Sequence, residues 1–262
     1  MESQTVRRIY RRPPLLEAVV EFQFEPPPGG WKSVFFGKIH SRIEAEFPLV
    51  ETFTGAQVQF GPEGGSVALG AAPEINRFIR DDGGVVATVG PDILGLSVLP
   101  PKIESGHPGW EWLRDRTLDL LQTYRETANP GRIRRVGVRY INVLPITPGE
   151  FQLDNFVAAE SEFVPGVLLE EHNPFSYRIE RSRGPGKEGH RTEVIHLSAQ
   201  PIRPNTARLM VDVDQLWIPG AGVELQDARP VLQALHDAVQ AVFERVIHPG
   251  VLDSFEPVEE GR

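Results

Sequence analysis

The spacing of apolar residues changes several times along the chain. Over residues 15–24 the even positions, from Leu16 to Phe24, are all apolar, which predicts a strand with this face buried. Over residues 31–47 they recur every three or four positions, as on one side of an amphipathic helix, and Pro48 ends this segment. The start of the chain therefore predicts a strand followed by a helix.

Short strands are predicted in the segment that follows. Between Phe53 and Leu99 the β-prone runs are separated by glycine and proline, and Asp82-Gly83-Gly84 is typical of a hairpin turn because glycine readily adopts positive φ. These runs cover residues 57–60, 66–69, 75–79, 85–89 and 93–99. We interpret them as an antiparallel meander.

Helical spacing returns over residues 110–128, where Asn129-Pro130-Gly131 ends the pattern. A strand is predicted over residues 133–144. Asp154 is placed to cap a short helix that reaches Phe163, and β-prone runs follow at 175–181, 192–198 and 207–216. The last helix is predicted over residues 227–247, with Asp227 as its cap, Pro230 in its first turn and Pro249-Gly250 after its end.

Together these segments predict an α+β protein with a mainly antiparallel sheet and about four helices. Residues 14–131 and 132–250 share the order strand, helix, strands, helix, and the two segments are almost equal in length. This order predicts two related α+β halves, although two unrelated neighbouring subdomains fit the same pattern. Residues 1–13 form a basic N-terminal arm, and residues 251–262 form an acidic tail.

Composition limits the classes of site that the chain can contain. The 262 residues are 40% hydrophobic and 24% charged, with a net charge of −9 and no cysteine. A disulfide framework, a thiolate zinc site and a cysteine nucleophile are therefore excluded. No apolar leader or membrane-length apolar stretch is present, so a cytoplasmic protein outside the membrane is expected. Neither a metal nor a cofactor is predicted.

Two predicted strands carry charges at matching intervals. Glu17 and Glu21 share one face of the first strand, and Arg135 and Arg139 share one face of the strand at 133–144. Antiparallel pairing would join Glu17 to Arg139 and Glu21 to Arg135, and each exposed pair would contribute about 0.2–1 kcal/mol. Alternatively, this face is the floor of a polar cleft in which the arginines hold a phosphate or carboxylate group.

Asp212 and Asp214 add two carboxylates on one face of the run at 207–216. Such a pair can bind a divalent cation with the help of a phosphate ligand, but salt bridges to neighbouring arginines are an alternative. The glycine-rich segment 182–190 does not precede a helix, so a hairpin connection is predicted in place of a phosphate loop. His236 lies near the apolar side of the last helix, where a core position is expected.

Several segments resemble a known family. Tyr10 with residues 13–22, the Gly-x-Arg-Tyr-x-Asn segment at 137–142, residues 211–214 and Leu235-His236 resemble a sporadically distributed family of uncharacterised bacterial and archaeal proteins. The resemblance implies a family but no activity. It directs attention to Glu17, Glu21, Arg139, Tyr140, Asn142 and Asp212.

Three functions follow as hypotheses. The first is a non-enzymatic module that binds a ligand or protein, or assembles as a homo-oligomer, through the sheet face or a groove. The second is a metal-assisted hydrolase or transferase that acts on a phosphorylated ligand. The third is a nucleic-acid binder that uses the N-terminal arm and the segment 182–190, against the net charge. The candidate ligand-binding residues are Glu17, Glu21, Arg135, Arg139, Tyr140, Asn142, Asp212 and Asp214.

Overall fold

The computed structural model describes residues 8–53, 56–60, 67–71, 74–99, 108–146, 152–158, 161–164, 166, 175–186, 189–203, 206–221, 225 and 227–259. The main strands are β2 (Leu15–Phe24), β3 (Leu49–Phe53), β6 (Ile75–Ile79), β7 (Val85–Val89), β8 (Ile93–Val98), β9 (Ile133–Ile146), β10 (Phe175–Gly186), β11 (Gly189–Arg203) and β12 (Thr206–Pro219). The helices are α1 (Val34–Ile43), α2 (Trp110–Ala128), α4 (Arg229–Val246) and α5 (Pro249–Asp253), with a 3-10 turn, η1, at Leu153–Asn155.

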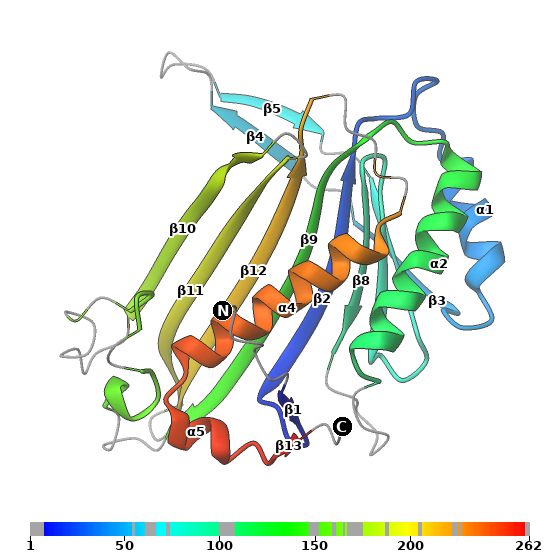
Figure 1. Ribbon diagram of the computed structural model, residues 1–262. Helices are drawn as coiled ribbons and strands as arrows, with labels where there is room; N and C mark the ends of the chain where they lie inside the picture. The colour runs from blue at the N-terminus through cyan, green and yellow to red at the C-terminus, as the bar shows by residue number, and fades with distance from the viewer. Residues whose placement is uncertain are drawn as a thin grey trace.

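The nine strands form one antiparallel sheet in the order β10-β11-β12-β9-β2-β8-β7-β6-β3. Figure 1 shows α4 lying across the middle of the sheet and α2 lying beside it on the same side. We call this side the helix face and the opposite side the far face. The predicted α+β class, with a mainly antiparallel sheet, is confirmed.

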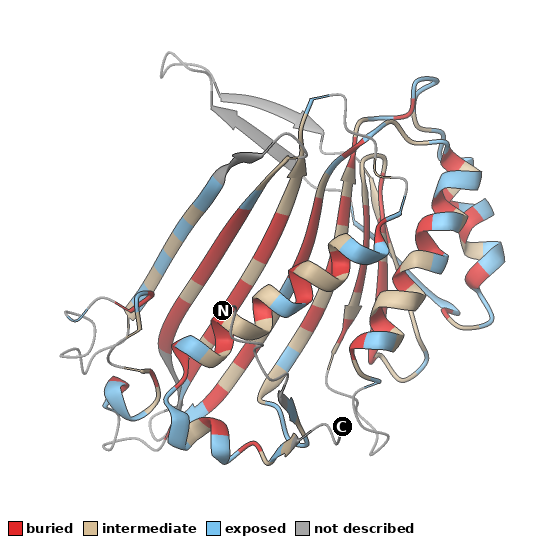
Figure 2. Ribbon diagram, viewed as in Figure 1, coloured by how far each residue is buried: buried red, intermediate tan, exposed pale blue. Residues whose placement is uncertain are grey.

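The alternation along β2 explains why this strand lies at the centre of the sheet. Ala18, Val20, Phe22 and Phe24 all face the helices and are at most 1% exposed. Burying a valine or phenylalanine side chain in this way stabilises the fold by about 1.5–3 kcal/mol, and the smaller Ala18 contributes less. Figure 2 shows the same alternation of buried and partly exposed positions along the central strands.

One end of β2 departs from the predicted alternation. Leu15 pairs with Asn142 and Glu17 pairs with Ile141, so Leu16 is an extra residue between two consecutive pairs. Such a bulge turns the side chain out of the alternation, and Leu16 is 40% exposed. The expectation that Leu16 belongs to the buried face is therefore wrong.

The two long helices begin and end within two residues of their predicted bounds. Asn129 ends α2 in the left-handed conformation, with φ of 44°, and its N–H donates to the carbonyl of Arg125. At the start of α4 the Asp227 carboxylate accepts from the N–H of Arg229 at 2.9 Å. Leu232, Leu235 and Val239 of α4 are fully buried against the sheet. These positions confirm the predicted helical stripes.

Several predicted elements differ from the structure. Within the described part of 154–163, only η1 forms, so the predicted helix is wrong there. The strand β3 was not predicted because all five of its residues are exposed and show no alternation. Pro249-Gly250 starts the short helix α5 after α4, because the His248 ring accepts from the N–H of Gly250. The segment 182–190 joins β10 and β11 as the predicted hairpin connection, but these strands extend further into it than expected, since they stay paired as far as Gly186 and Gly189.

The remaining strands lie outside the main sheet. β4 (Ala56–Phe60) pairs with β5 (Val67–Ala71). β1 (Arg8–Tyr10) pairs with β13 (Pro257–Glu259), so the described residues of the basic arm lie against the acidic tail. No helix within the described residues is long and apolar enough to cross a membrane.

Candidate functional site

The structure places six of the predicted site residues on the far face. Their alternation on β2, β9 and β12 directs them to this side, because residues two apart in a strand share a face. The register puts Arg139 between Val19 on one side and Asp214 on the other. The six residues are Glu17, Glu21, Arg135, Arg139, Asp212 and Asp214.

The two arginines on this face have carboxylate partners. Arg135 donates to Glu21 at 2.5 Å, as predicted for the antiparallel pairing of β2 and β9. Arg139 donates through Nε and Nη2 to the two oxygens of Asp212, at 2.8 and 2.6 Å. This bidentate contact raises the pKa of Arg139, to which the charge of Glu17 also contributes. The expected pair of Glu17 with Arg139 is therefore replaced by one with Asp212.

The neighbouring strand explains the exchange of partners. Asp212 lies on β12, which pairs with the other edge of β9, and this carboxylate is only 5% exposed. A buried carboxylate gains more from a bidentate arginine than a half-buried one does. Glu17 lies next to the bulge at Leu16, where β2 departs from the regular ladder. The pairing of β12 with β9 was not deducible from the spacing of charges in two strands.

Asp214 lies between these pairs without a hydrogen bond to any described residue. Burial raises the pKa of its carboxyl group to about 6, although Arg139 and Arg135 oppose the shift. Asp212 and Glu21 add to the rise because their negative charges repel a second carboxylate. The Asp214 carboxyl group therefore changes charge near pH 6.

This arrangement gives little support to phosphate or metal binding on the far face. Glu21 and Asp212 already neutralise the two arginines that were candidates for phosphate. The described residues contain no group of three His, Asp or Glu side chains placed to hold a metal ion. The far-face charges therefore act first as a cross-strand network that holds β2, β9 and β12 in register.

Tyr140 and Asn142 lie on the opposite side of the sheet from Arg139. They alternate with it along β9, so their side chains face α4. There they line a pocket of ≈ 220 Å³ between α4, the N-terminus of α2 and the segment that contains β1. The eight predicted residues therefore belong to two separate places. We call this pocket the aromatic pocket; its walls include Ile9, Tyr10, Pro13, Leu15, Trp110, Tyr140, Asn142, His236, Gln240 and Phe243.

Three side chains form a connected wall of the aromatic pocket. The Tyr140 hydroxyl and His236 Nδ1 are hydrogen-bonded at 2.8 Å. The Trp110 ring stacks on the His236 ring, with centroids 4.2 Å apart and an angle of 8° between the planes. The Trp110 indole N–H donates to Gln233 at 2.9 Å, which fixes the orientation of the ring. This wall combines flat apolar faces with a polar edge.

Separate elements bring this wall together. Trp110 is the first residue of α2, directly after Gly109, whose φ of 86° lets the chain turn into the helix. His236 is only 6% exposed and lies in the buried stripe of α4. Tyr10 closes one side, since its hydroxyl donates to Glu244 at 3.2 Å and its ring packs edge-on against Phe255.

The sequence signals for this pocket were weak individually. Trp110 and His236 were interpreted as members of apolar helical stripes, which is correct but incomplete. The segments that carry the family resemblance contain Tyr10, Tyr140, Asn142 and His236, and the structure brings these four residues to one pocket. The sequence signal that would have indicated the pocket is the combination of a histidine in the apolar stripe of a helix and an aromatic residue in a predicted strand.

The N-terminal arm gives no separate basic surface within its described residues. Arg12 forms an ion pair with Glu256 at 3.2 Å, and the N–H of Arg11 donates to the carbonyl of the same glutamate. The arm is therefore held against the acidic tail, an arrangement that does not favour nucleic-acid binding.

Comparison with other proteins adds no assignment. The sequence matches no protein-family model, and it matches no curated protein. The site is therefore interpreted from its own geometry.

Proposed function

We propose that the protein is a binding module whose ligand occupies the aromatic pocket. The observation that supports this proposal is the wall of Trp110, His236 and Tyr140 in an otherwise mainly apolar pocket. Binding sites for small molecules are typically apolar and aromatic, with a few placed polar groups. The flat rings offer stacking, and the polar edge offers a hydrogen bond.

The size of the pocket limits the ligand. Its ≈ 220 Å³ lies below the range of about 300–1,000 Å³ that is usual for larger ligands. A compact molecule with a single aromatic ring and one hydrogen-bonding group fits this volume. Such a ligand would stack on Trp110 and direct its polar group toward Asn142 or Gln240.

Fluorine NMR with 4-fluorophenol as the probe tests this proposal. The wild-type protein is expected to broaden the probe signal. Gln240→Trp places an indole in the pocket from α4 and is expected to abolish the broadening, because the added ring occupies the same volume. Asp237→Trp adds the same ring at an exposed position of α4 and serves as the control.

Equal broadening by the wild type and both variants would contradict the proposal. So would the absence of broadening by folded wild-type protein. Where 4-fluorophenol binds as expected, native mass spectrometry of the freshly purified protein identifies the natural ligand, as a mass that accompanies the wild type and Asp237→Trp but not Gln240→Trp.

A second candidate function, assembly of two copies through β3, rests on a different observation. Of the six large hydrophobic side chains exposed in the described part, three belong to this five-residue strand: Leu49 (50%), Val50 (47%) and Phe53 (47%). β3 is also the last strand of the sheet, and such an edge can pair with another strand.

The pattern of β3 suits pairing with itself. In an antiparallel pair centred on Glu51, Leu49 would lie opposite the partner's Phe53. Arg77 approaches Glu51 at 3.7 Å within each copy and would moderate the repulsion between the two carboxylates. We therefore propose a homodimer, acting in the cytoplasm, as the second candidate.

Light scattering after size-exclusion chromatography tests the dimer. The wild type is expected to be dimeric and Val50→Lys monomeric, because a charge on the edge strand opposes pairing. Val34→Lys is the matched control, since Val34 is a 55% exposed apolar residue on α1. A monomeric wild type, or a dimeric Val50→Lys variant, would exclude assembly through β3.

A further inference from the structure

A second pocket lies on the helix face, away from the aromatic pocket. It has a volume of ≈ 170 Å³ and lies between the C-terminal half of α4 and the strands β10, β11 and β12. Ala238 and Ala241 face it from α4, and their small side chains leave room between helix and sheet. The lining groups with formal charge are Arg183, Arg191, Arg245 and Glu193.

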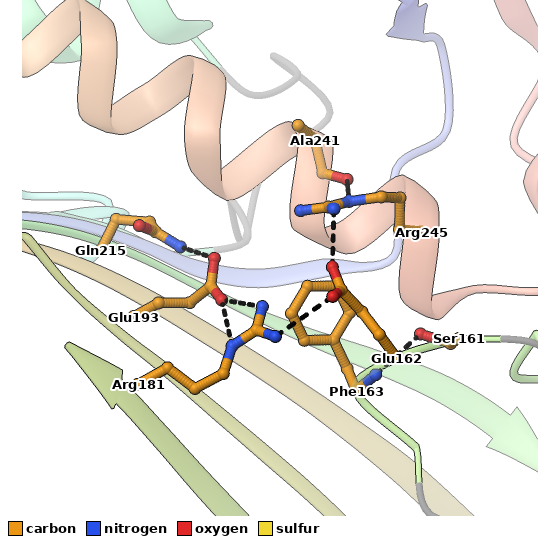
Figure 3. A network of polar contacts seen from close by, with 8 residues as sticks. All are labelled: Ser161, Glu162, Phe163, Arg181, Glu193, Gln215, Ala241 and Arg245. Carbon is orange, nitrogen blue, oxygen red and sulfur yellow. Dashed lines mark hydrogen bonds and ion pairs between the residues drawn. The ribbon is translucent and has the colours of Figure 1, made fainter. Parts of the chain in front are cut away.

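The floor of this pocket is a carboxylate whose charge is already balanced. Glu193 is 4% exposed. One of its oxygens accepts from Arg181 at 3.0 and 2.5 Å, and the other accepts from Gln215 at 2.8 Å. Figure 3 shows this contact beside the helix α4. A buried carboxylate that is held in this way presents little unbalanced negative charge to the pocket.

The same network fixes one of the arginines at the wall. Glu162 accepts from Arg245 at 2.8 Å and from Arg181 at 3.3 Å (Figure 3). The Phe163 ring lies against both guanidinium groups, 4.2 Å from that of Arg181 and 4.8 Å from that of Arg245. Arg245 is thus held by an ion pair and a ring contact at the edge of the pocket.

The other two arginines form an unbalanced pair. Arg183 on β10 and Arg191 on β11 are direct cross-strand partners and both line the pocket. Neither forms a hydrogen bond or ion pair with any residue in the described part of the chain. Like charges directly opposite each other on neighbouring strands are destabilising. An anion between the two guanidinium groups would remove this repulsion.

The surrounding charge has the sign that an anion requires. Four arginines, Arg181, Arg183, Arg191 and Arg245, face two glutamates, Glu162 and Glu193, both of which are used in ion pairs. In a chain with a net charge of −9, a local excess of positive charge is a marked departure from the average. Guanidinium groups bind phosphate oxygens with two parallel hydrogen bonds each.

We propose that this pocket is a phosphate-binding site in which Arg183 and Arg191 hold the oxyanion and Arg245 contacts it from α4. A liquid water takes about 30 Å³, so the pocket has space for a phosphate group together with a few waters. The site is independent of the ligand proposed for the aromatic pocket. It also differs from the far-face arginines, which have carboxylate partners.

Calorimetric titration with inorganic phosphate, at an ionic strength held constant with sodium chloride, tests the proposal. The wild type is expected to bind phosphate with saturation. Arg191→Gln is expected to weaken binding about tenfold or more, because it removes hydrogen bonds to a charged group. Arg178→Gln is the matched control, since Arg178 lies on β10, the strand that carries Arg183, but on the far face, and it is expected to bind as the wild type does.

Thermal unfolding of the same proteins provides a second measurement. Phosphate is expected to raise the Tm of the wild type and Arg178→Gln, but not that of the double variant Arg183→Gln/Arg191→Gln. Without phosphate, Arg191→Gln is expected to unfold no earlier than the wild type, because it removes a like-charge contact. The proposal is overturned by a wild type that binds no phosphate, by an unaltered double variant, or by an equal loss in Arg178→Gln.

Discussion

Asp214 illustrates how a residue's neighbours set its chemistry. Its position opposite Arg139 would suggest a simple ion pair, but Arg139 is engaged by Asp212. Burial raises the pKa of Asp214 to about 6, and the remaining charges do not offset this effect. The folded state therefore favours the protonated carboxyl group more than the unfolded chain does.

Ionisation of Asp214 is expected to reduce stability as the pH rises. The folded pKa of about 6 exceeds the ordinary value of 3.8, so the stabilising contribution is complete below pH 3.8 and is lost as the pH rises through 6. The loss amounts to about 2–3 kcal/mol. Urea unfolding measures this effect. Between about pH 4 and pH 7 the free energy of unfolding of Asp214→Asn is expected to rise by this amount relative to that of the wild type.

Asp82→Asn provides a control of opposite sign. The hydrogen bond from Arg80 lowers the pKa of Asp82, so its contribution is present above its ordinary value and is lost as the pH falls. This variant should lose stability relative to the wild type as the pH rises from about 3 to 5. A pH-independent difference between Asp214→Asn and the wild type would show that the Asp214 carboxyl group is not perturbed.

At the scale of one element, β2 shows how strongly the alternation divides its two faces. Phe22 is fully buried on the helix face, where it stacks with Phe24. Val19, on the far face, is only half-buried. Phe22→Ala is expected to lower the free energy of unfolding by about 3–5 kcal/mol. Urea unfolding, with circular dichroism as the signal, measures this change.

Val19→Ala is the comparison for that prediction. It shortens a side chain in the same strand but outside the core, and its expected cost is below about 1.5 kcal/mol. Similar losses for both variants would mean that the far face is as densely covered as the helix face.

The elements that could be predicted from sequence are those whose faces differ in polarity. The strands β2 and β6 and the helix α2 have the predicted bounds because their buried positions recur at the period of a strand or a helix. β7 also has the predicted bounds, although it is almost wholly buried, because Asp82-Gly83-Gly84 and Gly90-Pro91 delimit it. β3 could not be predicted, since it is exposed throughout. The lengths of β10 and β11 were underestimated because glycine and proline at 184–186 resemble a loop.

Only the part of the candidate site that is formed by two neighbouring strands could be predicted from the sequence. The pair of Glu21 and Arg135 follows from antiparallel pairing of two alternating strands. The aromatic pocket depends on Trp110, Tyr140 and His236, which belong to three elements and meet only through the packing of α2 and α4 on the sheet. Periodicity assigns each of them to a buried face but does not determine which buried residues meet.

At the scale of the whole molecule, the strands follow a corresponding order on the two sides of the contact between β2 and β9. β2 is the first strand of residues 14–131 and pairs with β9, the first strand of residues 132–250. The last strand of each half comes next, with β8 beside β2 and β12 beside β9. The remaining strands follow in reverse chain order on both sides. Duplication of one ancestral half would produce this strand order. A common origin of residues 14–131 and 132–250 stays a prediction.

The contact between the two ends of the chain connects the whole fold to the aromatic pocket. β1 pairs with β13, and Ile9 and Tyr10 form one wall of the pocket. Removing residues 257–262 is therefore expected to release Arg8–Tyr10 and to open that wall. Hydrogen exchange at the amides of β1 should accelerate to the rate of an unstructured chain, while β9 stays protected because its ladders with β2 and β12 remain.

The truncated protein should also bind 4-fluorophenol more weakly, since Tyr10 would no longer be held against Phe255. The loss of three cross-strand pairs is expected to cost only about 1–3 kcal/mol, so the main sheet should remain folded. Arg12→Gln is the milder comparison, because it breaks only the ion pair with Glu256 and leaves the strand pairing in place. If exchange in β1 were unchanged by the truncation, the contact with β13 would not be what holds the N-terminal segment at the pocket. Tyr10 would then be positioned through Glu244, Phe255 and the backbone of Glu256, all of which the truncation leaves in place.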